Sequence, residues 1–152
     1  MNEGVAGAGV PHDLVHLVVE RRMRDDTGFW GAVAAGAVFG SMEHLDGRRP
    51  PHAADRSRRA IRARADRLTR AELMAGLVEQ VIEHRLTTVE QVRKASRETL
   101  SVLPDARVDE QGVLAAAAEL CGVAREWAEL SPGEELVVDW PERRPARRPP
   151  RA

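Results

Sequence analysis

Two histidines four residues apart are the part of this sequence whose residue types and spacing could do chemistry. His12 and His16 follow Pro11, at what the pattern predicts to be the start of a helix. At that spacing both imidazole rings lie on one face of the helix, one turn apart. A helical His-x-x-x-His pair commonly offers two nitrogen ligands to one metal ion. The pair therefore indicates a candidate site for a divalent metal such as zinc.

A metal ion needs more ligands than this pair supplies. Glu20 lies one turn beyond His16 on the same face, but a straight helix rarely offers three ligands to one ion. Glu79 and Glu83 form a second acidic pair, four residues apart, in another predicted helix. Glu20, Glu79 and Glu83 are therefore possible further ligands, and the spacing identifies none of them.

The same four-residue spacing also arises without any ligand. On a helical wheel, His12, Asp13, His16 and Glu20 form a narrow polar stripe on an otherwise apolar helix. Such stripes face water in most amphipathic helices. The alternative is that this stripe lines a pocket. The motif is similar to the His-Glu-x-x-His of zinc metalloproteases, but Asp13 replaces the glutamate with a shorter acid, which argues against a protease.

Length and composition favour one helical domain. The chain has 152 residues, of which 43% are hydrophobic and 31% charged, with three Trp, two Phe and no Tyr. A core of Leu, Val and Ala suits packed helices. Cys121 is the one cysteine, which excludes an internal disulfide and a multi-cysteine zinc module. We expect Cys121 to be a small core residue.

The N-terminus and the apolar segments indicate where the protein works. Residues 1–9 contain no basic residue and no long apolar run, so no secretion signal is predicted. The most apolar stretch, residues 29–42, is too short to span a bilayer, which takes about 20 residues. We therefore expect a soluble cytoplasmic protein with no membrane partner.

Start and stop signals divide the chain into a flexible leader, a single helical domain and a disordered tail. The Thr69 and Glu72 pair predicts a capping box, a similar signal recurs at Thr87, and Asp109 predicts a further helix start. The predicted fold is mainly α, a compact bundle of five or six helices with one short C-terminal strand. The expected segments are a leader at 1–10, a domain at 11–140 with helices near 11–24, 29–42, 54–68, 70–85, 88–102 and 110–130, and a Pro/Arg-rich tail at 141–152.

The predicted strand covers Glu135 to Trp140. A lone strand is not stable by itself. It must pair with another segment or with a second copy of the chain, or lie packed as extended backbone. A homodimer formed through this strand is therefore one expectation.

An arginine-rich segment between residues 56 and 70 includes Arg58, Arg59 and Arg62. On a helix these side chains could bind phosphate groups of a nucleic acid. The net charge of the whole chain is only −1, however, and all of its 23 basic residues except Lys94 are arginines. We therefore favour a solvated helix face, so that nucleic acid is an unlikely partner and an anion site at these arginines a weak prediction.

Several short motifs resemble a family of small uncharacterised actinobacterial proteins. They are Val10-Pro11-His12-Asp13-Leu14-Val15-His16, Gly28-Phe29-Trp30-Gly31, Arg48-Arg49-Pro50-Pro51-His52 and Pro132-Gly133-Glu134-Glu135-Leu136. The resemblance covers most of the chain, and it implies no particular activity. It does imply a strand-forming segment before the first motif, where this chain has a glycine-rich leader.

Two functions of different classes follow from these residues. The first is a cytoplasmic protein that binds a divalent metal or a polar ligand at His12 and His16, with any reaction being metal-assisted hydrolysis. The second is a non-catalytic interaction protein, dimeric through its strand, whose Arg-rich helix meets an acidic partner or nucleic acid. The sequence does not decide whether the protein is an enzyme.

Overall fold

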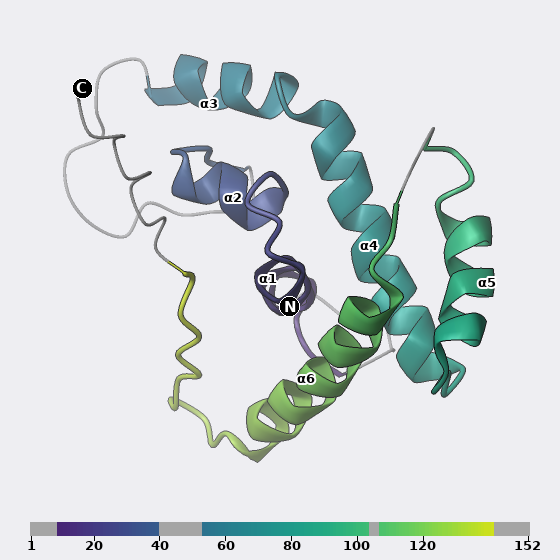
Figure 1. Cartoon of the computed structure of the whole chain (residues 1–152). Coiled ribbons are helices and arrows are strands. Elements are labelled where there is room, and N and C mark those ends of the chain that lie inside the picture. The colour runs from purple at the N-terminus through teal and green to yellow at the C-terminus, as the bar shows by residue number, and fades with distance from the viewer. Residues whose placement is uncertain (1–8, 40–52, 104–106, 142–152) are drawn as a thin grey trace, which may run out of the picture.

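A computed structural model describes residues 9–39, 53–103 and 107–141. Within these ranges the chain forms six helices and no β-strand, which confirms the mainly α class. Figure 1 shows α1 almost end-on in the middle of the fold, with α2, α4 and α6 around it. The helices are α1 (His12–Met23), α2 (Phe29–Ala34), α3 (Ala53–Arg62), α4 (Ala65–Glu83), α5 (Val89–Thr99) and α6 (Glu110–Glu129).

Helix α1 is the central element, and its predicted bounds are confirmed. Pro11 precedes the first turn with a φ of −56°, which suits a helix start. Arg24 ends the helix in the left-handed conformation, with a φ of 54°. Helix α1 contacts α2, α4 and α6, and its residues from Val15 to Glu20 are all buried.

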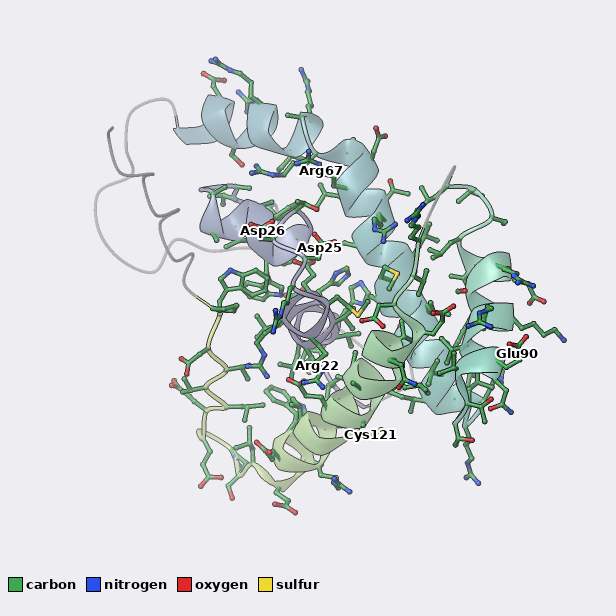
Figure 2. All side chains as sticks on the ribbon, in the orientation of Figure 1. Arg22, Asp25, Asp26, Arg67, Glu90 and Cys121 are labelled. Carbon is green, nitrogen blue, oxygen red and sulfur yellow. The ribbon has the colours of Figure 1, made fainter. Side chains whose placement is uncertain are left out.

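The core consists almost entirely of aliphatic side chains. Burying one Val or Leu side chain contributes about 1.5–3 kcal/mol, so this set dominates the stability of the fold. The core cluster comprises Val10, Val15, Val18, Val19, Met74, Ala75, Leu77, Val78, Val81, Val92, Leu100, Val113, Ala116, Ala117 and Leu120. Cys121 is exposed on α6 (Figure 2), so its predicted core position is wrong.

Local capping signals predicted some helix starts and misplaced others. Asp109 accepts a hydrogen bond from the Gly112 amide and caps α6, as predicted. The capping box before α5 forms between Thr88 and Gln91, one residue later than predicted. The Thr69 box does not form, because α4 has already begun at Ala65 and the Thr69 hydroxyl donates to the Ala65 carbonyl instead.

Helix α2 is much shorter than the predicted helix at 29–42. It ends at Ala34, and Gly36 then turns the backbone with a φ of +92°. Residues 40–42 of the predicted helix lie outside the described residues. Ser57 of α3 holds the segment after α2 in place, since its hydroxyl donates to the Val38 carbonyl and accepts from the Val38 amide.

The predicted C-terminal strand is not formed in the part of the chain that the structure describes. Residues 135–140 have no partner strand there and carry no regular secondary structure. Leu136, Val138 and Trp140 are half-buried, whereas the residues between them are exposed. Arg21 of α1 donates to the Asp139 carbonyl at 3.3 Å. A homodimer formed through this segment stays a prediction.

Most of the leader and almost all of the tail lie outside the described residues. Residues 104–106, before α6, lie outside them as well. The division into a leader at 1–10, a domain at 11–140 and a tail at 141–152 stays a prediction. None of the helices in the described ranges is both long enough and apolar enough to cross a membrane.

Gly31 of α2 provides a test of this packing. A Cβ atom at Gly31 would overlap the Asp26 backbone, which cannot move as a flexible side chain can. Gly31→Ala is expected to lower the free energy of unfolding by about 1–3 kcal/mol, as overpacking does, measured by urea denaturation.

Gly76→Ala is the matched control, because a Cβ atom there meets nothing within 4 Å inside α4. It is expected to raise the free energy of unfolding by about 0.5–1 kcal/mol, the usual gain of Ala over Gly in a helix. Equal effects of the two substitutions would contradict the close approach at Gly31.

Candidate metal centre

The structure brings three potential metal ligands together where α1 meets α4. They are His12 and His16 of α1 and Glu72 of α4, and one ligand atom from each lies within 4.8 Å of the others. The two Nε2 atoms are 3.1 Å apart. Glu72 Oε2 lies 3.2 Å from His12 Nε2, and Glu72 Oε1 lies 3.3 Å from His16 Nε2.

The packing of α4 against α1 places Glu72 at this point. Helices α1 and α4 are in contact, and Ala71 and Ala75 are buried on α4. Glu72 lies between them in sequence, at the edge of that contact. His12 and His16 face it because they are one helical turn apart on α1.

The spacing of these atoms matches that of ligands around one ion. Zinc bound at about 2.0–2.1 Å by each ligand separates its ligand atoms by about 3.3 Å in a tetrahedral site. Each Glu72 oxygen faces one of the two nitrogens, and these four atoms can also satisfy one another by hydrogen bonding, since one Nε2–H can donate to the other nitrogen or to the carboxylate. The three side chains are therefore close enough to share one ion.

The three candidate ligands differ in their access to solvent. The His16 side chain is 3% exposed, whereas those of His12 and Glu72 are 53% and 59% exposed. His16 lies in the core, whereas His12 and Glu72 leave the outer side of the cluster open to solvent. An ion held here would have a coordination position that water or a small molecule could reach.

Glu20, one of the three predicted third ligands, has a different role in the structure. Its carboxylate is buried and accepts hydrogen bonds from the first two amides of α2, at 2.7 Å from Phe29 and 2.9 Å from Trp30. The sequence stripe of His12, His16 and Glu20 is thus divided, with Glu20 under α2 and His12 at the surface. Glu20 lies behind His16, on its Nδ1 side.

The contact between Glu20 and His16 is longer than an ordinary hydrogen bond. His16 Nδ1 lies 3.4 Å from Glu20 Oε1, and this buried nitrogen has no partner in hydrogen-bonding geometry. Burial alone would lower the pKa of His16, but the Glu20 and Glu72 carboxylates outweigh burial and raise it above its ordinary value. The cluster thus favours a positive charge at this position, which a proton or a metal ion can supply.

The other predicted ligands do not reach the cluster. Glu79 is seven residues beyond Glu72 on α4, which is about 10.5 Å along the helix axis, and Glu83 is one turn further. In the described residues, the metal-type cluster contains neither of them. Arg58, Arg59 and Arg62 are exposed on α3, where Arg58 pairs with Asp55 of its own helix. Binding of an anion or nucleic acid by these arginines stays a prediction.

Sequence reasoning noticed Glu72 but gave it the wrong role. It was predicted as the partner of Thr69 in a capping box, and only the packing of α4 on α1 reveals its contact with the histidines. The available signal was its position directly after a residue of the apolar face of α4. That signal alone does not identify a ligand.

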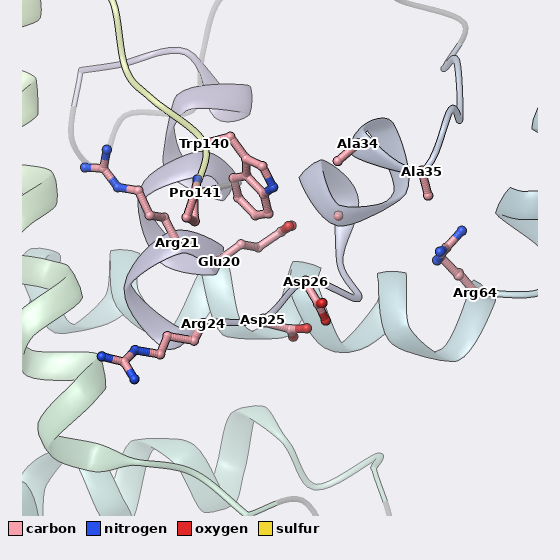
Figure 3. Close-up of a pocket in the computed structure, with 11 residues that line it drawn as sticks. Glu20, Arg21, Arg24, Asp25, Asp26, Ala34, Ala35, Arg64, Trp140 and Pro141 are labelled. Carbon is pink, nitrogen blue, oxygen red and sulfur yellow. The ribbon is translucent and has the colours of Figure 1, made fainter. Parts of the chain in front are cut away.

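A cavity of about 910 Å³ lies beside Glu20, away from the histidines. Figure 3 shows Trp140 and Pro141 of the C-terminal segment above Glu20, with Asp25 and Asp26 below it and Arg64 across the opening. Glu20 therefore forms part of the wall between the histidine cluster and this cavity. The lining residues are Glu20, Arg21, Arg24, Asp25, Asp26, Gly31, Ala34, Ala35, Arg64, Trp140 and Pro141.

Comparison of the chain with models of protein families, with curated proteins and with solved structures finds no match.

Proposed function

We propose that this protein binds a divalent transition metal ion, best matched by zinc, through His12, His16 and Glu72. The observation that carries the proposal is the convergence of two imidazole nitrogens and one carboxylate, at separations of 3.1–3.3 Å, from two helices of the core. Two His and one Glu form the ligand set of several catalytic zinc sites.

Three protein ligands leave at least one coordination position for water. Zinc in such a site lowers the pKa of bound water to about 7, which provides hydroxide at neutral pH. The exposed side of the cluster at His12 and Glu72 gives this position access to solvent. Metal-assisted hydrolysis is therefore the reaction class that we propose for the site.

The first test is the stoichiometry and affinity of zinc binding to the purified protein, by isothermal titration calorimetry. We expect one equivalent in the wild type. His12→Ala and Glu72→Gln should each weaken binding at least tenfold, because each removes one of three ligands. Both residues are exposed, so both variants should fold normally.

Matched controls come from the same helices and residue types. Glu79→Gln removes an acid from α4 beyond reach of the site, and His84→Ala removes an exposed histidine at the end of α4. Both should bind zinc as the wild type does. Equal losses in the controls, or one equivalent of zinc retained by the His12→Ala/Glu72→Gln double variant, would contradict the site.

Bound metal should also stabilise the folded protein. A ligand at a free concentration of 100 times its dissociation constant adds about 2.7 kcal/mol to the free energy of unfolding. Zinc should therefore raise the midpoint of thermal unfolding in the wild type, and a chelator should reverse the shift. The His12→Ala/Glu72→Gln variant should show no shift, and a shift of wild-type size would place the metal elsewhere.

A further inference from the structure

Glu20 makes contacts in two directions with a single buried carboxylate. Toward α2, its two oxygens accept hydrogen bonds from the Phe29 and Trp30 amides at 2.7 and 2.9 Å. Within α1, its Oε1 faces His16 Nδ1, one turn earlier, at 3.4 Å. The same oxygen thus faces both the start of α2 and the buried candidate ligand.

We propose that Glu20 is a positioning residue that couples metal binding at His12, His16 and Glu72 to the docking of α2. This inference rests on the proposed function, because it concerns the state of the same site. Glu20 does not bind the ion, and it acts through His16 on one side and through two backbone amides on the other.

The two histidine rings explain why metal binding would reach Glu20. Their Nε2 atoms lie 3.1 Å apart, so without an ion one of them carries a hydrogen; where that hydrogen is on Nε2 of a neutral His16, Nδ1 carries none and cannot donate to Glu20, in keeping with its lack of a partner in hydrogen-bonding geometry. An ion bound by both Nε2 atoms requires both to be free of hydrogen. A neutral His16 must then carry its hydrogen on Nδ1, which faces Glu20.

That hydrogen would turn a long contact into a hydrogen bond. His16 Nδ1 has no partner in hydrogen-bonding geometry and lies 3.4 Å from Glu20 Oε1, which leaves room for the distance to shorten. A carboxylate that accepts from the second nitrogen of a ligating histidine fixes its tautomer and ring orientation. Glu20 is placed to have this effect on His16.

The same carboxylate passes the change to α2. Glu20 accepts from the first two amides of α2, and the Phe29 ring also packs near His16, with ring centroids 5.7 Å apart. A hydrogen bond from His16 would restrict the Glu20 carboxylate, and its hydrogen bonds to these two amides would then break less often. Local opening of α2 would then become rarer when the ion is bound.

The test combines two measurements on the full chain with zinc as the probe. Nitrogen chemical shifts of the His16 ring report which nitrogen carries the hydrogen, and hydrogen exchange reports the opening of α2. On zinc binding we expect the hydrogen to reside on Nδ1 and exchange of the Phe29 and Trp30 amides to slow. Neither change should occur in His12→Ala/Glu72→Gln.

Two variants change the Glu20 carboxylate in different ways, one by removing its charge and one by displacing it. Glu20→Gln removes the charge, and we expect it to weaken zinc binding about 10–100-fold, the usual effect of losing such a partner. Gly28→Ala keeps every charge, but its Cβ would lie 2.5 Å from Glu20 Oε1 and displace the carboxylate. It should weaken zinc binding in the same direction.

Asp25→Asn is the matched control. Asp25 is a nearby acid whose carboxylate accepts from the Thr27 amide and hydroxyl, so it orders the same loop without facing His16. Its zinc affinity should stay within twofold of that of the wild type.

The outcomes distinguish this inference from the proposed function. One equivalent of zinc in the wild type, with unchanged affinity in Glu20→Gln and unchanged exchange at Phe29 and Trp30, would overturn the coupling and leave the metal site standing. Absence of zinc binding in the wild type would overturn both.

Discussion

A buried carboxylate, that of Glu20, is the constraint on which this end of the molecule depends. Glu20 is 2% exposed, and burying a charge is costly unless hydrogen bonds replace the lost water. Helix α2 supplies that replacement with its first two amides. The six-residue helix is too short to be stable alone. Glu20 and α2 therefore stabilise each other, since the amides of α2 solvate the buried carboxylate and the carboxylate caps the short helix.

The core determines where the polar groups meet. The middle of helix α1, from Val15 to Glu20, is buried, so a polar residue of α1 either lies near an exposed end or needs partners from the neighbouring helices. His12 emerges near the first turn, whereas His16 is enclosed by α2 and α4. The contact between α1 and α4 brings Glu72 to both histidines. The cluster is thus a consequence of how aliphatic helices pack.

Local signals in the sequence predicted the elements that have strong local causes. Pro11 and Asp109 marked the starts of α1 and α6, because a fixed φ and a side-chain cap act within a few residues. Thr69 failed because the residues before it were already helical. The strand at 135–140 was wrong because a short apolar run cannot supply a partner strand, and the segment contacts Arg21 of α1 instead.

The part of the candidate site that lies within one helix was predicted, and the part that depends on tertiary packing was not. The spacing of His12 and His16 follows from one helix and could be read directly. The position of Glu72 beside His16 depends on a contact between residues 56 positions apart, which no spacing rule encodes. Glu20 was one of several possible further ligands, and its carboxylate accepts from two amides. Tertiary packing decided which of several similar acids took each role.

The missing side chain of Gly28 carries a consequence for how this sequence can change. A Cβ atom at that position would occupy the space of the Glu20 carboxylate. Positions 20 and 28 are therefore coupled, although eight residues separate them. A descendant that gained a side chain at 28 would have to displace the Glu20 carboxylate, which accepts from the first two amides of α2 and lies behind His16. Substitution at a single glycine in a loop would in this way alter a feature of the buried helix.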